Sequence, residues 1–344
     1  MPVIPLIAAL LIAFLIAVAV ITLSMPLLQR YALARPNARS SHRIPTPQGG
    51  GIAVVAGALA TAYGGAALIG VMPGMGAAFA LATGTLLLAL IGAWDDIRPM
   101  AALPRLALQT GCVALLIGFA PVEASLFPDD WPAGLGFAIA LLAGLWFVNL
   151  VNFMDGLDWI TVAEMVPVTA ALALFGWFGF LDPFATLLAA ALCGALCGFS
   201  LFNKPVARLF LGDVGSLPIG LIVAWQLYLL ATNGHVVAAI LLPLYFCADA
   251  TITLIRRAMR RERLFEAHRS HFYQRATDNG FTAMQVAGHV LAVNLALIAL
   301  AGATLILPHS VMQALAMVVG ISVVTALLIR FSRPKPHAKT GEDE

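Results

Sequence analysis

The feature that most constrains this chain is a series of apolar runs, each about 17 to 23 residues long, that recur from one end of the sequence to the other. An α-helix of that length crosses the hydrocarbon core of a bilayer. Only 10% of the 344 residues are charged and 61% are hydrophobic, a composition that excludes an ordinary soluble domain. The sequence therefore predicts an all-α, polytopic integral membrane protein.

Eleven of these runs fit a membrane span. They lie at 3–23, 51–72, 77–93, 104–121, 133–151, 160–180, 183–201, 216–232, 236–255, 284–306 and 311–330. The first run has no basic segment before it and is too long and uniformly apolar for a signal peptide, so we interpret it as a membrane helix. We expect residues 1–331 to form a single transmembrane domain and the polar residues 332–344 to form a disordered tail.

The basic residues predict the orientation of the chain. All nineteen Lys and Arg fall in alternate loops or in the tail, whereas the intervening loops carry only acidic residues and histidines. The positive-inside rule makes the basic side cytoplasmic, with a periplasmic N-terminus and a cytoplasmic C-terminus. One span more or fewer would mix the two kinds of loop, so the sorting also supports the count of eleven.

A polar stretch follows the fifth predicted span, where Asn149, Asn152, Asp155 and Asp158 are spaced three residues apart. On an α-helix each such step turns the chain by about 300°, so neighbouring members share a face and the set sweeps a broad arc. A 3₁₀ turn would place them in one line instead. An ordinary polar loop is the alternative. The acidic loops on the same side of the membrane favour a functional site.

Carboxylates recur in two other cytoplasmic loops. Asp95 and Asp96 are adjacent with no lysine nearby, which is unfavourable unless a cation joins them. Asp213 lies between Gly212 and Gly215, and these glycines allow a backbone or a ligand to approach closely. Ser216 is expected to cap the eighth span. The sequence therefore indicates acidic sites after the third span and before the eighth.

Two further carboxylates are expected inside the membrane. Glu164 falls within the sixth span, and Asp249 lies within two turns of the cytoplasmic end of the ninth. A carboxylate at that depth is costly and is functional by default. Pairing with a neighbouring span is the structural alternative, and the sequence leaves both interpretations open.

The first and last cytoplasmic loops hold groups that suit phosphate. In the first, prolines followed by glycines 49–51 predict a stiff turn and then an exposed backbone with free N–H groups, near Ser41 and His42. In the last, His268 and His271 have helical spacing within an arginine cluster. The structural alternatives are a plain connector and contact with anionic lipid headgroups. A zinc site at the histidines is disfavoured because no third ligand is adjacent.

Together these loops indicate phosphoryl transfer at the membrane surface. Carboxylate oxygens suit Mg²⁺, which usually binds phosphates as well, and Arg, His and glycine N–H groups suit a diphosphate. Such reactions depend mainly on positioning and on neutralising charge. A secondary transporter, the competing class, would place its polar groups near the bilayer midplane, often with a repeat symmetry that we do not find in this sequence.

In their order and topology the motifs resemble those of the polyprenyl-phosphate N-acetylhexosamine-1-phosphate transferases, glycosyltransferase family 4. The motifs are Asp95-Asp96, Asn149 to Asp158, Gly212 to Ser216, and His268-Arg-Ser-His271. The resemblance implies transfer of a HexNAc-1-phosphate from a UDP-sugar to undecaprenyl phosphate, with release of UMP. It implies Mg²⁺ as cofactor, with Mn²⁺ as a possible substitute. It also implies a multi-pass protein in the inner membrane with a cytoplasmic site, a possible homodimer, and no nucleic-acid partner.

The resemblance also assigns roles to residues of this chain. Asp213 resembles the metal ligand, with Asn152 and Asp96 as further candidates. The residues implied in catalysis are Asp95, Asp96, Asp155 and Asp158. The residues implied in substrate binding are Asn149, Asn152, His268, Arg269, His271, Ser41, His42 and Gly50.

Two departures from the family pattern bear on the substrate. The members that make the peptidoglycan precursor carry adjacent histidines in the last loop, whereas this chain has His268-Arg-Ser-His271. That pattern resembles the branch that starts O-antigen and other surface polysaccharides. Trp159 stands where many members have glycine, which leaves the donor sugar open. A phospho-N-acetylmuramoyl-pentapeptide transferase is the alternative within the family.

Overall fold

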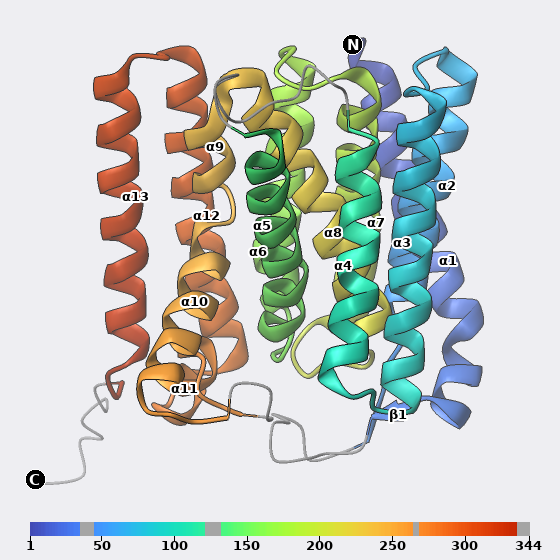
Figure 1. The fold of residues 1–344 in the computed structure, drawn as a ribbon. Coiled ribbons are helices and arrows are strands. Elements are labelled where there is room, and N and C mark those ends of the chain that lie inside the picture. The colour runs from blue at the N-terminus through green and yellow to red at the C-terminus, as the bar shows by residue number, and fades with distance from the viewer. Residues whose placement is uncertain (35–44, 121–131, 264–267, 336–344) are drawn as a thin grey trace, which may run out of the picture.

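The computed structural model describes residues 1–34, 45–120, 132–263 and 268–335. Its helices run side by side as one bundle (Figure 1). The helices are α1 (Val3–Tyr31), α2 (Gly51–Ile69), α3 (Met75–Ile97), α4 (Ala102–Gly118), α5 (Ala133–Met154), α6 (Ile160–Trp177), α7 (Pro183–Asn203), α8 (Asp213–Leu230), η1 (Ala231–His235), α9 (Val236–Leu241), α10 (Leu244–Met259), α11 (Phe272–Asp278), α12 (Ala283–Ile306) and α13 (Ser310–Phe331). Two short strands, β1 (Leu33–Ala34) and β2 (Thr46–Pro47), pair antiparallel.

The predicted class, an all-α polytopic membrane protein, is confirmed. Within the described residues nine helical segments are long and apolar enough to cross a membrane, and α4 is a shorter apolar helix. One of the nine, Asp213–Leu241, contains a break at Gly234, where φ is +89°. The predicted ninth span is interrupted because Pro243, between α9 and α10, has no N–H with which to continue the helix. The count of eleven and the orientation of the termini stay predictions.

Several helices extend further than their apolar runs. α1 continues to Tyr31 and α3 to Ile97, so Asp95 and Asp96 lie in the last turns of a helix. α8 begins at Asp213 after Gly212, and the expectation that Ser216 caps this helix was wrong. Hydropathy marks the part of a helix that lipid or protein covers, whereas backbone hydrogen bonding continues into the polar residues beyond it.

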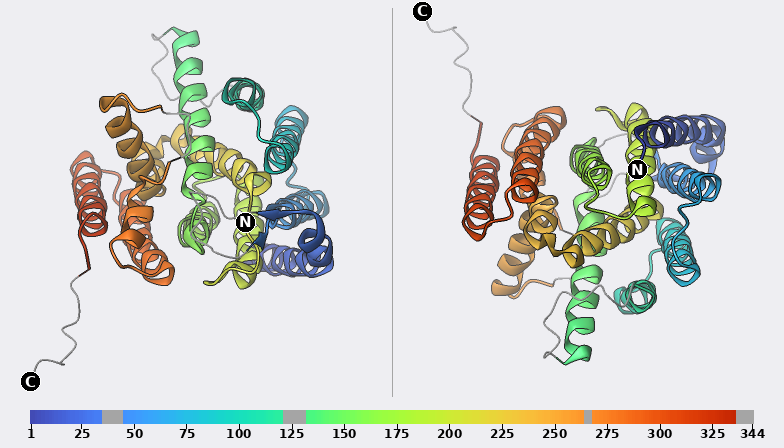
Figure 2. Two further views of the ribbon diagram at one scale, coloured as in Figure 1. Left: turned by 90° about the horizontal axis from the view of Figure 1, so that it is seen from below. Right: turned by 90° about the horizontal axis from the view of Figure 1, so that it is seen from above.

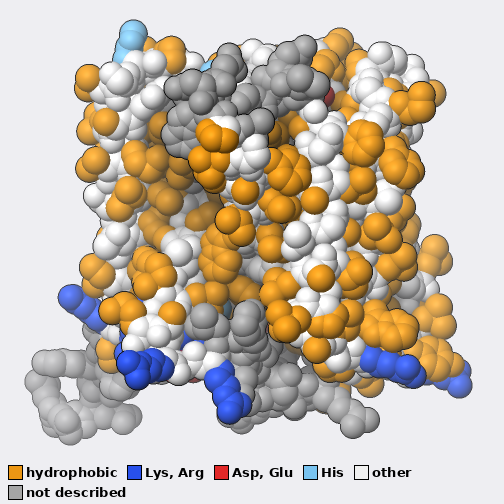
Figure 3. All heavy atoms as spheres, viewed as in Figure 1, with side chains coloured by type: hydrophobic (Ala, Val, Ile, Leu, Met, Phe, Trp, Pro, Cys, Tyr) orange, Lys and Arg blue, Asp and Glu red, His pale blue; other side chains and the backbone are white. Residues whose placement is uncertain are grey.

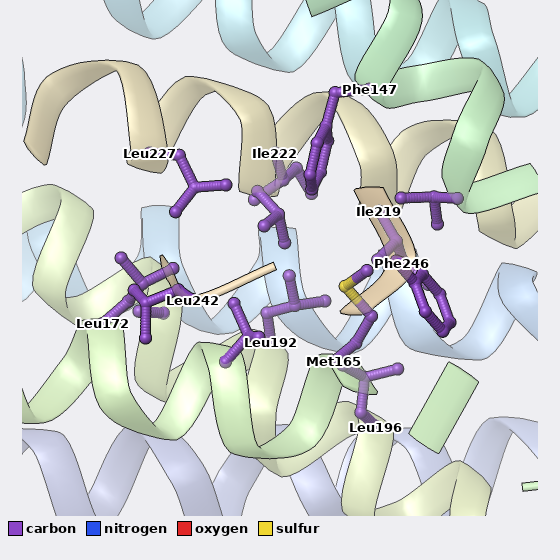
Figure 4. Packing of buried hydrophobic residues seen from close by; sticks show 14 of the residues in the cluster. Phe147, Met165, Leu172, Leu192, Leu196, Ile219, Ile222, Leu227, Leu242 and Phe246 are labelled. Carbon is purple, nitrogen blue, oxygen red and sulfur yellow. The ribbon is translucent and has the colours of Figure 1, made fainter. Parts of the chain in front are cut away.

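The centre of the bundle is formed by α6, α7 and α8. Viewed along the bundle, α1 to α4 lie on one side of these helices, and α12 and α13 on the other (Figure 2). In the apolar core shown in Figure 4, Phe147 of α5 lies beside Ile222 of α8, and Met165 of α6 belongs to the same buried cluster. Close approach depends on small residues: a Cβ at Gly194 of α7 would lie 2.0 Å from the carbonyl oxygen of Leu10. The rigid centre positions the helix ends that carry polar groups.

Charge gathers at one end of the bundle. On the face seen in Figure 3 the described Lys and Arg side chains line the lower edge, and the surface above them is largely hydrophobic. That edge is the end where α11 and β1 lie (Figure 1). Arg30, Arg98 and Arg330 lie at or just beyond the ends of α1, α3 and α13, which reach this edge. The polar helix ends described next belong to the same end of the molecule.

Candidate active site

The site is built around the first turn of α8. Gly212, with φ +77°, turns the chain into this helix. The carboxylate of Asp96, from the last turn of α3, accepts hydrogen bonds from the backbone N–H groups of Asp213 (3.1 Å) and Val214 (3.2 Å). These N–H groups have no partner within the helix, and a negative charge is favourable at a helix N-terminus. Asp96 therefore caps α8 and fixes the position of Asp213.

Asp213 keeps one carboxylate oxygen open. Its Oδ1 accepts a hydrogen bond from Asn152 Nδ2 at 2.7 Å, and the same amide donates to Ser216 Oγ at 3.0 Å. Its Oδ2 lies 3.7 Å from Arg105 Nη1, and no described residue donates a hydrogen bond to it. About a quarter of the Asp213 side chain, 26%, is exposed. This oxygen can therefore reach a ligand without losing an existing hydrogen bond.

Asp95 has a cationic partner that the sequence analysis did not assign. Its Oδ2 accepts from Arg105 Nη1 at 2.8 Å, and its Oδ1 accepts from the Met100 N–H at 2.5 Å. The sequence indicated that the pair needs a cation, and Arg105 is the cation at Asp95, because α3 and α4 form a hairpin that brings residues 95 and 105 together. Arg105 also faces Asp213, so one guanidinium serves two carboxylates. The position of Arg105 in the first turns of an otherwise apolar helix was the feature of the sequence that could have indicated this role.

The glycines at the start of α2 serve packing. The N–H groups of Gly50 and Gly51 donate to the carbonyl oxygens of Phe210 and Leu211, both at 2.9 Å. A Cβ on Gly51 would lie 2.1 Å from the Cα of Gly215, so α2 and α8 touch at their first turns. The expectation of an exposed backbone with free N–H groups was wrong at Gly50, whose N–H is bonded and which is buried. The predicted substrate contacts Ser41 and His42 lie outside the described residues.

The four regularly spaced polar residues face different partners. Asn149 donates to Gln109 Oε1 of α4 at 2.8 Å, whereas Asn152 reaches Asp213. Asp155 accepts from the hydroxyl of Thr161 at 2.5 Å, and Asp158 accepts from the Ala207 N–H at 3.0 Å. Only Asn149 and Asn152 lie on α5, which ends at Met154, so the expected helical arc holds for these two, whereas Asp155 and Asp158 lie in the turn before α6. Asn152 is the member that joins Asp213, and the role of Asn149 in substrate binding stays a prediction.

Asp155 is poised to titrate near neutral pH. Burial raises the pKa of its carboxyl to about 7. The hydrogen bond from Thr161 lowers the pKa of Asp155, whereas the charges of Asp96 and Asp158 raise it. A group with a pKa near the working pH is suited to accept and release a proton. The environment of Asp155 is therefore compatible with a general base.

The backbone explains the departure at Trp159. This residue has φ +63°, the left-handed region in which a glycine is unstrained and a side chain costs about 1–2 kcal/mol. The conformation is held by two hydrogen bonds: the Trp159 N–H donates to Asn203 Oδ1, and the indole Nε1 donates to the Ser200 carbonyl, both at 2.8 Å. The indole thereby joins the start of α6 to the end of α7, beside Asp158.

The histidine segment packs against α10 and around α11. His271 Nδ1 lies 3.3 Å from Asp249 Oδ1, and the His271 side chain is 3% exposed. The His268 ring lies 4.9 Å from the His271 ring, and its Nδ1 contacts Ser270 Oγ at 2.9 Å. Arg269 pairs with Asp278 at 3.2 Å. In the described residues these three therefore form one local structure with α11, and their contact with a diphosphate stays a prediction.

Glu164 pairs with neighbouring spans. It is fully buried in α6; its Oε2 accepts from Asn294 Nδ2 of α12 at 2.6 Å, and its Oε1 accepts from the Phe246 N–H of α10 at 3.3 Å. Of the two interpretations that the sequence left open, the structure shows the pairing.

A groove of about 1100 Å³ opens beside Asp158. Its lining includes Met25, Thr46, Asp158, Phe202, Arg208 and Met284. These residues come from α1, β2, the turn before α6, α7, the loop after α7, and α12. The volume matches the pockets that hold drug-sized ligands, and walls that are mostly apolar with a few polar groups are usual in such pockets.

The ligand set suits a metal shared with a substrate. Within the part of the chain that the structure describes, no three His, Cys, Asp or Glu side chains are grouped to hold a metal ion by themselves. Mg²⁺, however, is commonly bound by one or two carboxylates together with phosphates and water. The open oxygen of Asp213 fits that requirement, and Asn152 lies beside it.

Comparisons with known proteins identify the family of the chain. Residues 78–231 match the family model described as glycosyl transferase family 4. The chain is 30% identical over 302 residues to a phospho-N-acetylmuramoyl-pentapeptide-transferase of Mycolicibacterium vanbaalenii, covering 72% of this chain and 82% of that one. It is 24% identical over 279 residues to a probable undecaprenyl-phosphate N-acetylglucosaminyl 1-phosphate transferase of Bacillus subtilis, covering 77% and 76%.

The fold and the site thus define a membrane protein with a cluster of carboxylates, amides and an arginine at one end of its helical bundle. The chain belongs to glycosyl transferase family 4, the polyprenyl-phosphate sugar-phosphate transferases. The resemblance seen in the motifs is confirmed.

Proposed function

We propose that this protein transfers a HexNAc-1-phosphate from a UDP-sugar to undecaprenyl phosphate and releases UMP. The product would be an undecaprenyl-diphosphate sugar, made in the first membrane step of O-antigen or another surface polysaccharide. The observation that carries the proposal is the open oxygen of Asp213, held by Asp96 and Asn152 and faced by Arg105. The Bacillus subtilis relative, whose name states this reaction with N-acetylglucosamine, supports it.

The proposed cofactor is Mg²⁺, with Mn²⁺ as a possible substitute. Asp213 would hold it through Oδ2, and Asn152 and Asp96 are the further candidate ligands. When bound, the ion neutralises charge on phosphate oxygens and aligns them for transfer. Asp96 has a second task in any case, because both of its oxygens accept backbone N–H groups of α8. We therefore expect Asp213 to be the main protein ligand.

Each of the other residues has a defined task in the proposed reaction. Arg105 lies between Asp95 and Asp213, and because a guanidinium binds phosphate oxygens in a fixed fork, it would contact a substrate phosphate that binds beside Asp213. Asp155, ionised above a pH of about 7, would take the proton of the acceptor phosphate. The groove beside Asp158 is large enough for the donor. Asp158 itself is held by Ala207 at the wall of that groove.

The membrane dictates where the two substrates meet. A polyprenyl phosphate keeps its tail in lipid, so its phosphate reaches only the bilayer surface. A UDP-sugar stays in water because stripping water from its charges is prohibitive. We propose that the basic end of the bundle is cytoplasmic, which follows the positive-inside rule and puts the N-terminus in the periplasm. The protein would then be an inner-membrane enzyme with its site on the cytoplasmic face.

A second candidate function is transfer of phospho-N-acetylmuramoyl-pentapeptide to the same lipid. The relatives that are 30% identical over most of their length carry that name and favour it. The His268-Arg-Ser-His271 sequence favours the first candidate, because it resembles the branch that starts surface polysaccharides, whereas Trp159 leaves the donor sugar open. A transporter fits less well, because Glu164 is engaged by two neighbouring helices.

The test is donor selection by the purified protein. The protein in nanodiscs is supplied with undecaprenyl phosphate, Mg²⁺ and, in separate reactions, UDP-GlcNAc, UDP-GalNAc or UDP-MurNAc-pentapeptide, and UMP is measured. We expect release with an N-acetylhexosamine donor and no release with Asp213→Asn. UMP formed only from the pentapeptide donor would establish the second candidate. No UMP from any donor would contradict both.

A further inference from the structure

Two carboxylates buried inside the bundle are not used by the proposed chemistry. Glu164 of α6 and Asp249 of α10 are each 0% exposed. Neither has a cation from Lys or Arg among its described partners, and both are surrounded by hydrogen-bond donors. Burying an acidic group is costly unless its oxygens are satisfied. The arrangement of those donors indicates what the two residues do.

Glu164 caps α10 where Pro243 breaks the ninth span. Breaking a helix frees the N–H groups of the next first turn, and inside a membrane each unpaired group costs several kcal/mol. The Phe246 N–H, in that first turn, donates to Glu164 Oε1 at 3.3 Å. On the other oxygen, Asn294 of α12 donates at 2.6 Å and also bonds the Ala163 carbonyl at 3.0 Å. Glu164 thus fixes the start of α10 between α6 and α12.

Asp249 caps α11 from one turn further along α10. Its oxygens accept two backbone N–H groups of the α11 first turn, from Phe272 at 2.9 Å and Tyr273 at 3.1 Å. Side-chain donors complete its set: His271 Nδ1 at 3.3 Å, the Tyr245 hydroxyl at 3.2 Å and the Thr253 hydroxyl at 3.4 Å. Since a carboxylate only accepts, His271 presents its Nδ1 proton to Asp249 and keeps Nε2 for another partner.

α11 in turn contacts the turn that carries Asp155. The Tyr273 hydroxyl donates to the Phe153 carbonyl at 3.2 Å. A Cβ on Gly156 would lie 2.2 Å from that hydroxyl, so the turn and α11 are in tight contact. A shift of α11 would therefore move both the histidine segment and the turn between α5 and α6.

We propose that Glu164 and Asp249 are positioning residues that act in series. Glu164 sets α10, and Asp249, three residues beyond Phe246 on the same rigid helix, sets α11 and His271. Neither residue is proposed to touch a substrate. Their effect on the donor rests on the proposed function, whereas their effect on the order of α11 does not.

The first test measures the order of α11 without using activity. Hydrogen exchange of the full-length protein in nanodiscs is followed for peptides covering 244–250, 272–278 and 213–230. Asp249→Asn places an amide against backbone donors, and we expect residues 272–278 to lose protection by about tenfold or more, the scale of one lost buried acceptor. Glu164→Ala should deprotect both 244–250 and 272–278, while 213–230 stays unchanged.

Two variants serve as controls. Glu164→Gln still accepts the Phe246 N–H and can donate to Asn294 Oδ1, a buried atom without a partner among the described residues, so protection should return. Asp182→Ala removes a cap of similar chemistry from α7, where Asp182 accepts the Ala185 N–H at 2.9 Å. It should leave 272–278 unchanged. If Glu164→Ala deprotects only 244–250, the two residues do not act in series and the proposal is overturned.

The second test separates binding of the two substrates. With the donor identified by UMP release, Asp249→Asn should raise the apparent KM for the UDP-sugar about tenfold while the KM for undecaprenyl phosphate changes less than about twofold. A uniform loss of kcat with both KM values unchanged would contradict a positioning role toward the donor. If the wild-type protein releases no UMP from any donor, the proposed function fails, and the exchange experiment still decides whether Glu164 and Asp249 order α11.

Discussion

The first turns of α8 and α11 are both capped by a carboxylate from another helix, but only the first turn of α8 leaves a carboxylate oxygen free to bind a ligand. Each begins at the basic end of the bundle and is capped by a carboxylate from another helix, Asp96 for α8 and Asp249 for α11. At α8 the first helical residue, Asp213, keeps an oxygen that no described residue hydrogen-bonds, and its side chain is 26% exposed. At α11 the cap is fully buried, and the side chain of His271 is 3% exposed.

The difference indicates that acidic residues in similar positions, at the first turn of a helix, have different roles. At α8 the cap orients a second carboxylate toward a ligand, so one oxygen of Asp213 remains available. At α11 both oxygens of the capping residue, Asp249, accept hydrogen bonds from the protein, so Asp249 holds other groups in place and has no oxygen left for a ligand. Substitutions at the two helix ends should therefore have different effects on activity and on stability. Four experiments distinguish these effects.

The largest effect is expected from Asp213→Asn. The asparagine can still accept from Asn152, so the fold should persist, but the charge beside the reacting phosphates is lost. Removing one group that stabilises transition-state charge costs about 10²–10³ in kcat, and we expect a loss of at least that size in UMP release. Asp182→Asn, at the start of α7, is the matched control. Near-wild-type activity of Asp213→Asn at limiting Mg²⁺ would refute its assignment as metal ligand.

Asp96→Ala should lower both stability and activity. It leaves the N–H groups of Asp213 and Val214 without their acceptor, and an unsatisfied buried donor costs about 1–3 kcal/mol. Because Asp96 is only half-buried, water can replace part of the loss. We expect a lower thermal unfolding midpoint in detergent, with Asp96→Asn in between because it keeps one acceptor. An unchanged midpoint for Asp96→Ala would show that the cap contributes nothing to α8.

The two histidines should separate binding from stability. His268→Ala and His271→Ala are each expected to raise the KM for the UDP-sugar about tenfold, the scale of one hydrogen bond to a charged group, while the lipid KM stays unchanged. Only His271→Ala should also lower the unfolding midpoint, because His271 is buried against Asp249 and Tyr273. His309→Ala, exposed at the start of α13, is the control. Variants that raise only the lipid KM would overturn this assignment.

The smallest effect concerns pH. Burial raises the pKa of Asp155 to about 7, so its ionised form, and with it the rate, should increase as the pH rises through that value. Thr161→Val removes the hydrogen bond that lowers this pKa, so the midpoint of the rate profile should move to higher pH. Thr161→Ser keeps the hydroxyl and should leave the midpoint in place. A Thr161→Val profile that coincides with that of the wild type would exclude Asp155 as the titrating group.

The class of the fold could be predicted because apolar runs of spanning length are a local property of the sequence. Glycines 212 and 215 also indicated close approach, and Gly215 does touch Gly51. The ends of helices were less predictable. Asp213 was expected in a loop before its span, whereas it is the first residue of α8.

The partners of the acidic residues could not be predicted, because they join positions far apart in the chain. Asp96 and Val214 are 118 residues apart, and Glu164 and Asn294 are 130 apart. The sequence gives residue types and spacing, whereas these contacts depend on which helices are neighbours in the bundle. Arg105 was counted only as a charge that sets orientation, although the α3–α4 hairpin makes it the partner of Asp95.

The length of α4 has a consequence for the choice of lipid. Its 17 residues rise about 25 Å, less than the roughly 30 Å of a typical hydrocarbon core. Longer neighbours such as α3 and α5 span that thickness, and a bilayer accommodates a shorter helix by local thinning or by snorkelling of flanking residues, at a cost of fractions of a kcal/mol per Å. Arg105 lies near the start of this short helix and links Asp95 to Asp213. In a thicker membrane, adjustment of the helix to the bilayer would therefore act on the position of Arg105. The acyl-chain length of the surrounding lipid is therefore expected to affect the activity.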